Sequence, residues 1–255
     1  MFTSILRFIK FILINFLTYK NFFYNFNNNK YSREISKNGY TVIHNFLNSK
    51  ECELIRKEID LYLKKNLKKV SVFKNYDYRI FSFHKVSKKT NKILKNKFLS
   101  KIVLNYENKD KINYSFTLAA KLINKPNNNG SGNGWHRDNT NARYPKALIY
   151  LKDCNIKNGP FEYVPKSHKL LNILNFILLT KIDFSKKKFS NKPIKHFFKS
   201  KKIVTKVFTE KKGTAIIFDS MGLHRGRPIY ENNRYALTNY YYCNKDDSGK
   251  GFKHI

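Results

Sequence analysis

Short apolar segments separated by polar turns fill the chain from residue 113 onward and predict a β-rich fold. These segments are rich in β-branched and aromatic residues, the types that strands favour. They read NYSFTLAAKLI, ALIYL, FEYV, KIVTKVF, GTAIIFD and RYALTNYYYC, and GYTVIHNFL at 39–47 has the same character. After the first of them comes PNNNGSGNG, whose turn residues predict a long loop.

Two other segments have the spacing of helices. Residues 47–65, with Asn48 or Ser49 as the N-cap, place Ile55 and Ile59 on one apolar face. Residues 168–182 predict a second helix, inside a stretch at 170–202 that we expect to be an insertion. Residues 64–112 predict no clear element. A helix-bearing first part followed by several strands favours a mainly β fold, a sandwich or barrel with flanking helices.

The first 37 residues differ from the rest of the chain, which we expect to form one domain at 38–255. Residues 1–17 are apolar but interrupted by Arg7 and Lys10. The run that remains is too short to span a bilayer, which takes ~20 residues. An amphipathic helix on an anionic membrane surface fits this pattern. A helix packed on the protein's own core, or an incorrectly assigned start codon, fits it equally well. Residues 24–37 are polar and predict a linker.

The net charge of +34 points to a polyanionic partner, either nucleic acid or an anionic membrane. The chain is also rich in amino acids with A/T-rich codons, and only nine of its 51 basic residues are Arg. Codon bias therefore explains the charge as well, and the scattered lysines make nucleic acid an unlikely partner. Three widely spaced cysteines without a CxxC pattern suit a reducing compartment and predict a cytoplasmic protein, membrane-associated if its N-terminus binds lipid.

The segment GWHRDN at 134–139 introduces candidate metal ligands. His136 and Asp138 alternate on an extended chain, so their side chains point to the same side and can reach one ion. His224 follows a predicted strand that ends at Asp219, where the mouth of a barrel would place it. Two histidines and one carboxylate form the facial triad of non-haem Fe(II) oxygenases, which leaves coordination positions open. Each residue alone is ordinary for a loop, but the three together predict an iron site.

Arg234 lies ten residues after His224 and opens an apolar strand, where a cation needs an anionic partner. A guanidinium pairs with a carboxylate through two parallel hydrogen bonds. 2-Oxoglutarate chelates Fe(II) through its oxo acid end and carries a second carboxylate at its far end. The four residues together therefore predict an oxygenase that uses 2-oxoglutarate.

On these motifs the chain resembles the phytanoyl-CoA dioxygenase family of Fe(II)/2-oxoglutarate-dependent oxygenases, over about residues 38–243. The segments that carry the resemblance are NGYTVIHNFLNSKECELIRKEI, GWHRDN, NGPFEYVPKSHK and GLHRGRPIYENNRYALT. The resemblance implies a double-stranded β-helix, a jelly-roll or cupin-like barrel of two facing sheets with iron at its open end.

The resemblance also assigns roles to individual residues. It implies that His136, Asp138 and His224 are the catalytic iron ligands and that Arg234 binds 2-oxoglutarate. Polar groups on nearby strands often assist the cosubstrate, and the candidates here are Thr238 and Tyr150. In the segment at 158–169, Ser167 and His168 are expected to shape a loop beside the site instead of taking part in catalysis.

The expected activity is hydroxylation, with Fe(II) as cofactor and with 2-oxoglutarate and O2 as cosubstrates that yield succinate and CO2. Halogenating relatives lack the carboxylate ligand, and Asp138 is present. A small-molecule, lipid or glycan-type substrate is expected. Arg137, Arg143, Arg225 and Arg227 flank the ligands and either hold an anionic group of that substrate or are solvated loop charges.

Two alternatives stay open at this point. A nucleic-acid demethylase of the same superfamily would carry a second Arg close after Arg234, and the sequence there, YALTNYYYCN, has none. A catalytically silent binding protein with the same barrel would be expected to have lost site residues, and all four are present.

Overall fold

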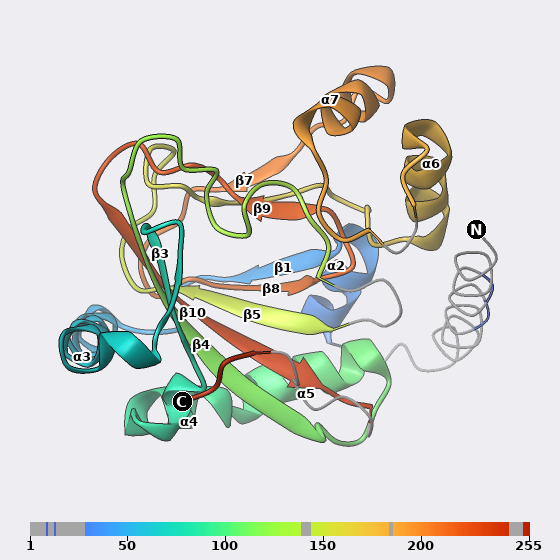
Figure 1. Cartoon of the computed structure of the whole chain (residues 1–255). Helices are drawn as coiled ribbons and strands as arrows, with labels where there is room; N and C mark the ends of the chain where they lie inside the picture. Colours follow the sequence, from blue (N-terminus) through green and yellow to red (C-terminus); the bar gives the residue numbers. More distant parts are fainter. Residues whose placement is uncertain (1–8, 10–12, 14–28, 139–143, 184–185, 245–251) are drawn as a thin grey trace.

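Two antiparallel sheets face each other in this protein (Figure 1). The computed structural model describes residues 9, 13, 29–138, 144–183, 186–244 and 252–255. The large sheet has the strand order β1-β8-β5-β10-β4-β3-β2, and the small sheet has the order β7-β6-β9. The large sheet comprises β1 Tyr40–Ile43, β2 Ser71–Phe73, β3 Asp77–Phe81, β4 Tyr114–Ile123, β5 Pro145–Tyr150, β8 Ala215–Asp219 and β10 Asn233–Tyr242. The small sheet comprises β6 Phe161–Tyr163, β7 Lys206–Phe208 and β9 His224–Gly226.

Helices cover the outer face of the large sheet and one end of the small one (Figure 1). The first group is α2 Lys30–Asn38, α3 Ser49–Asn66, α4 Lys88–Leu94 and α5 Lys97–Glu107, with the short 3-10 helices η1 Leu67–Lys69 and η2 Phe83–Lys85. The second group is α6 Leu170–Thr180 and α7 Asn191–Ser200, which together occupy most of the expected insertion. The result is the mainly β fold with flanking helices that the strand pattern predicted.

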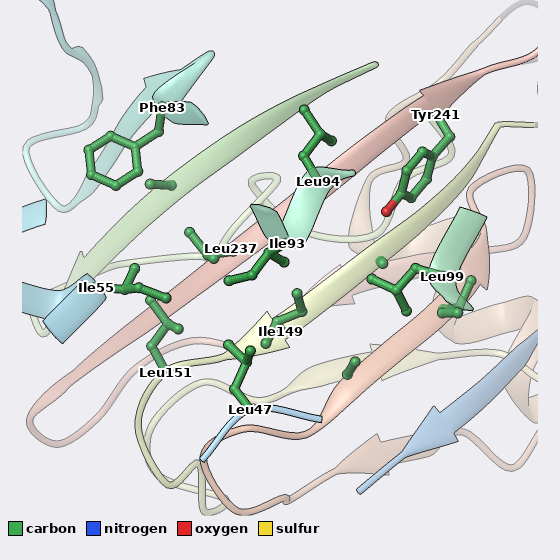
Figure 2. Close-up of a cluster of buried hydrophobic side chains, with 14 of the residues drawn as sticks. Leu47, Ile55, Phe83, Ile93, Leu94, Leu99, Ile149, Leu151, Leu237 and Tyr241 are labelled. Atoms are coloured by element: carbon green, nitrogen blue, oxygen red, sulfur yellow. The ribbon is translucent and has the colours of Figure 1, made fainter. Parts of the chain in front are cut away.

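Side-chain alternation along the strands creates two cores. On β10, Leu237 and Tyr241 point outward and join a cluster with Ile55 of α3 and Leu99 of α5 (Figure 2). The alternate residues Ala236, Thr238 and Tyr240 point inward, and Ala236 packs with aromatic side chains of both sheets. Since successive residues of a strand face opposite sides, one strand serves both cores. The inner face also carries the polar side chains of the site.

The segment predicted as a linker at 24–37 is helical in its second half. Asn29 caps α2 by accepting a hydrogen bond from the backbone N–H of Tyr31, and Gly39 ends the helix with a φ of 91°. Ile35 is fully buried against the outer core. Only Tyr31 and Ile35 of this polar helix pack against the core, so its apolar face is too small to stand out in the sequence. The same applies to α7, where Ile194 and Phe197 are the buried residues of a Lys-rich segment.

The hypothesis of membrane contact concerns residues 1–30, which lie almost entirely outside the described residues. Among the helices that the structure does describe, none combines the length and apolar character that a membrane span requires.

Candidate metal centre

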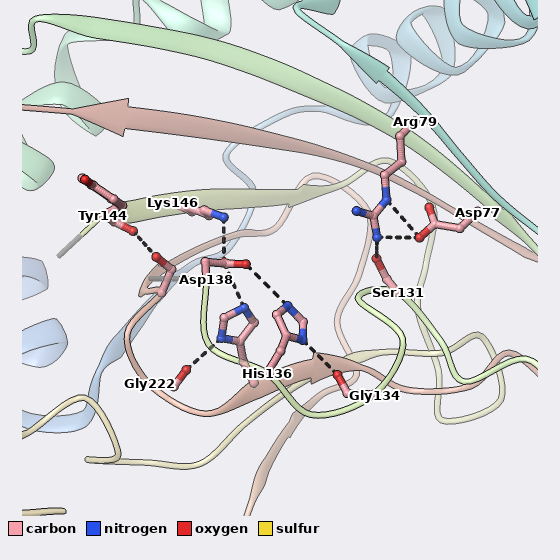
Figure 3. Close-up of polar contacts among 11 residues, drawn as sticks. Asp77, Arg79, Ser131, Gly134, His136, Asp138, Tyr144, Lys146 and Gly222 are labelled. Atoms are coloured by element: carbon pink, nitrogen blue, oxygen red, sulfur yellow. Dashed lines mark hydrogen bonds and ion pairs between the residues drawn. The ribbon is translucent and has the colours of Figure 1, made fainter. Parts of the chain in front are cut away.

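Three side chains from two separate segments converge at one end of the barrel (Figure 3). His136 and Asp138 come from the segment before β5, and His224 is the first residue of β9. Their ligand atoms all lie within 4.8 Å of one another. The carboxylate lies between the two imidazoles, with His136 Nε2 3.6 Å from Oδ1 and His224 Nε2 3.2 Å from Oδ2.

Backbone hydrogen bonds hold the two segments together. The N–H of His136 donates to the carbonyl of His224 at 2.9 Å, and the N–H of His224 donates back to His136 at 3.0 Å. The N–H of Asp138 donates to the carbonyl of Ser220 at 3.0 Å. The alternation expected from GWHRDN is thus realised as a short antiparallel bridge, which fixes all three ligands relative to one another.

Both imidazoles are oriented by the same device. Nδ1 of His136 lies 2.9 Å from the carbonyl oxygen of Gly134, and Nδ1 of His224 lies 2.9 Å from that of Gly222. A carbonyl only accepts, so each Nδ1 carries the proton and each Nε2 presents its lone pair to the carboxylate side. Burial, reinforced by the neighbouring His224, lowers the pKa of His136 to about 3. The neutral form that binds a metal is therefore the one present near neutral pH.

Lys146, on β5, is a member of the site that the sequence analysis missed. Its Nζ lies 2.7 Å from Asp138 Oδ2 and 3.9 Å from the ring centroid of Tyr240. Burial alone would raise the pKa of Asp138, but Lys146 and His224 hold it well below its usual range. Lys146 and Leu148 are two residues apart on β5, so both side chains face the pocket. This spacing could have been recognised in the sequence.

The triad opens into a pocket between the sheets that is lined by Arg79, Lys146, Arg234 and Thr238. Arg234 is only 4% exposed. Its Nη1 donates to the carbonyl of Gly159, while its Nε is buried and has no hydrogen-bond partner among the described residues. A buried guanidinium N–H without an acceptor is unfavourable, so the pocket suits an anion. Arg79 is partly satisfied by Asp77, at 2.6 Å, and by Ser131.

Residues 35–230 match the family described as phytanoyl-CoA dioxygenase. This match covers well over half of the chain. The chain belongs to the phytanoyl-CoA dioxygenase family. Membership confirms the predicted class, a non-haem dioxygenase with Fe(II) as cofactor and 2-oxoglutarate and O2 as cosubstrates. A search of curated proteins gave no match.

Solved structures of the same architecture include the epimerase SnoN in complex with Fe3+, alpha-ketoglutarate and nogalamycin RO. It is 12% identical, with a TM-score of 0.63 over 84% of this chain and 82% of that one. EctD from S. alaskensis with bound Fe is 15% identical, with a TM-score of 0.62 over 86% and 79%. HygX from Streptomyces hygroscopicus, with nickel, 2-oxoglutarate and hygromycin B bound, is 15% identical, with a TM-score of 0.57 over 85% and 87%. These likenesses confirm the predicted double-stranded β-helix fold.

The two weaker family-based candidates differ in their placement. Thr238 lines the pocket, four residues along β10 from Arg234 and on the same face. Tyr150 is fully buried and lies outside the residues that line the pocket. Its hydroxyl donates to the carbonyl of Phe208 at 3.2 Å and accepts from the N–H of Phe161 at 2.8 Å. Tyr150 therefore joins the two sheets, and we do not carry it forward as a cosubstrate ligand.

Other residues of the family motifs have structural contacts. Ser167 donates to the carbonyl of Val164 and accepts from the N–H of Leu223, so it fixes the turn beside β9. His168 lies 3.2 Å from the carbonyl of Ser36. Arg225 pairs with the buried Glu162 at 2.7 Å. An anionic substrate group would therefore have to compete with Glu162 for Arg225. Arg227 lies 3.9 Å from the same carboxylate, and Arg143 lies outside the described residues.

Gly132 sits directly against His136, which leads to a first prediction. Gly132 has a φ of 82°, and a Cβ atom there would lie 2.1 Å from His136 Cε1. We expect Gly132→Ala to displace the imidazole and to weaken Fe(II) binding at least about 10-fold, as other changes around metal ligands do. Gly213→Ala is the control, because Gly213 also has a φ of 82° and its Cβ would meet a similarly close neighbour, the backbone of Leu47, away from the metal ligands. Equal Fe(II) affinity of the two variants, measured by anaerobic titration, would contradict the prediction.

Proposed function

We propose that this protein hydroxylates a small organic substrate, with Fe(II) held by His136, Asp138 and His224. The observation that carries the proposal is the orientation of the three ligand side chains toward one another. Both Nε2 atoms face the same carboxylate, and both Nδ1 atoms are committed to carbonyls. Two neutral imidazoles and one carboxylate are the donor set that Fe(II) takes in this class of oxygenases. Asp138 occupies the position that halogenating relatives leave free, which supports hydroxylation.

Arg234 is proposed to bind the distal carboxylate of 2-oxoglutarate, with Thr238 beside it. The unpartnered Nε of Arg234 supplies a donor that a carboxylate can accept, and its planar guanidinium suits bidentate pairing. Gly226 makes room for it, since a Cβ at that position would lie 2.9 Å from Arg234 Nη2. When bound, iron and 2-oxoglutarate supply the chemistry that inserts one oxygen atom of O2 into a C–H bond and releases succinate and CO2.

The remaining pocket residues orient the ligands and limit the entry of water. Lys146 holds the carboxylate of Asp138, while the two backbone carbonyls keep the imidazoles turned toward it. Leu148, Phe161 and Phe218 form the apolar part of the lining. An apolar wall keeps water from competing for the polar groups and strengthens their electrostatic interactions.

A small-molecule substrate is supported by the enclosed position of the site and by the solved neighbours. SnoN and HygX, named above, were solved with nogalamycin RO and hygromycin B, respectively. The site opens between two sheets that enclose it, and the lysines are scattered along the sequence instead of forming one cluster. This arrangement favours a compact organic molecule over a nucleic acid.

The function can be tested by anaerobic titration of the metal-free protein with Fe(II) and then with 2-oxoglutarate. We expect the weak visible charge-transfer band of an iron-bound 2-oxo acid to appear, followed under air by release of succinate. A folded protein that develops no band would contradict the proposal and would favour the silent binding protein.

A second prediction concerns Lys146. Lys146→Met is expected to change Fe(II) affinity little, because loss of the contact that orients Asp138 lowers the affinity and removal of a positive charge beside the cation site raises it. The same change should weaken 2-oxoglutarate binding about 10-fold, because the pocket loses a charge that attracts the dianion. Lys121→Met is a matched control, since Lys121 also pairs with an aspartate at 2.7 Å, Asp60, on the opposite face of the sheet. Weaker Fe(II) binding with unchanged 2-oxoglutarate binding, in the same titration, would refute this role.

A further inference from the structure

A second cavity lies on the other side of the metal-binding segment from the iron pocket. Its volume is about 320 Å³, within the size range of small-molecule sites. Apolar lining comes from Val164, Phe197 and Leu223, and charged lining comes from Arg137, Lys166 and Lys201. The two cavities share no lining residue. Because His136 and Asp138 face the iron pocket, the residue between them, Arg137, faces away from it.

Two nitrogen atoms of the Arg137 guanidinium are buried without an acceptor in the described part of the chain. Arg137 is 3% exposed, and its Nε and Nη2 are buried and have no hydrogen-bond partner among the described residues. Its guanidinium carbon lies 4.9 Å from the ring centroid of Phe176, in α6, and 5.7 Å from that of Phe189. Aromatic faces attract a cation, but they do not replace the planar hydrogen bonds that its N–H groups lose on burial.

The charged side chains that line the cavity are all basic among the residues that the structure describes. This lining has no Asp or Glu, and the two lysines at its mouth are exposed. A buried cation is normally paired or coordinated. The surroundings of Arg137 therefore favour binding of a negatively charged ligand from outside the chain. The apolar walls on the opposite side would accommodate a short hydrocarbon part of the same ligand.

We propose that this cavity binds a small organic anion, a carboxylate or a phosphate monoester, whose charged group pairs with Arg137. Its apolar part would lie against Val164, Phe197 and Leu223. The planar fork of Arg137 suits both oxyanions. Since the cavity is separate from the iron pocket, the anion is a second ligand and not the cosubstrate, and its binding does not depend on the proposed catalytic function.

The test uses the metal-free full-length protein and isothermal titration calorimetry. Hexyl phosphate and hexanoate are the probes, hexanol is the uncharged control, and inorganic phosphate is the control without an apolar part. We expect one-site binding of at least one hexyl anion, weaker binding of inorganic phosphate and no binding of hexanol. The anion that binds with the higher affinity, hexyl phosphate or hexanoate, shows whether the cavity prefers a phosphate or a carboxylate.

Variants then locate the binding to the cavity. Arg137→Met should weaken binding of the preferred anion about 30-fold or more, as loss of one partner of a buried charge pair does. Arg33→Met makes the same change in charge at an exposed position on α2 and should bind the anion as the wild type does. Lys201→Glu changes only the exposed mouth, so it preserves the fold, and it should weaken binding several-fold.

Several results would overturn the proposal. One is the absence of anion binding by the wild type, and another is Arg137→Met binding as tightly as the wild type. Equal weakening by Arg33→Met would show a general charge effect and would also overturn it. Circular dichroism checks that Arg137→Met is folded. If it is not, Lys201→Glu becomes the test, and an anion affinity equal to that of the wild type would refute the site.

Discussion

Replacing His224 by alanine is expected to abolish the charge-transfer band that Fe(II) and 2-oxoglutarate should form in the wild type. His224 supplies one of three ligand atoms that lie within 4.8 Å of one another. Changes to residues that merely support metal ligands lower metal affinity 10- to 100-fold, so loss of a ligand should exceed about 100-fold. Anaerobic titration with Fe(II), read at the visible band and by metal content after gel filtration, measures the effect.

The control for this prediction is His44→Ala. His44 is exposed and lies near Glu210, in a part of the chain that contributes nothing to the iron pocket. The two variants lose the same chemical group, so only a specific metal site separates them. A band of wild-type intensity in His224→Ala would show that the iron is held elsewhere.

Replacing Arg234 by alanine should remove 2-oxoglutarate binding while Fe(II) binding persists. Arg234 is buried at the inner face of β10 and has an unpartnered Nε. Truncating one partner of a buried charge pair costs about 2–5 kcal/mol, which corresponds to a loss of about 30-fold or more in cosubstrate affinity. Lys at this position keeps the charge but not the planar fork, so Arg234→Lys should recover part of the affinity.

The combination of the two variants separates the metal site from the cosubstrate site. His224→Ala should lose both ligands, whereas Arg234→Ala should retain iron and require far more 2-oxoglutarate to produce the band. Arg33→Ala, at an exposed position, controls for the change in net charge. If Arg234→Ala binds 2-oxoglutarate as tightly as the wild type, Arg234 is not the carboxylate-binding residue. Arg79 and Lys146, which also line the pocket, would then be the candidates.

The strands and the metal ligands could be predicted from the sequence because each has a local signal. β5, β8 and β10 are runs of apolar residues bounded by polar ones, and in the large sheet they lie side by side between β1 and β4. The triad could be predicted because two ligands share one segment, and the third follows a strong strand. In each case neighbouring residues carry enough information without knowledge of the tertiary contacts.

The parts that were missed depend on contacts between distant segments. Lys146 and Arg79 look like ordinary basic residues in a chain with 51 of them, and only the pairing of β3, β4, β10 and β5 brings them to one pocket. The helices α2 and α7 bury just a few apolar side chains each, so neither stands out in the sequence from the polar segment around it. Tyr150 was proposed from its position on a strand near the site. Its hydrogen bonds to Phe161 and Phe208 could not be foreseen.

The reciprocal backbone hydrogen bonds between His136 and His224 have a consequence for the working life of the enzyme. They run between backbone atoms and use none of the ligand atoms, so removal of the ion should leave the two segments joined. Rebinding of metal should then need no refolding of the chain. Chelation followed by addition of fresh Fe(II) should therefore reactivate the same molecules repeatedly.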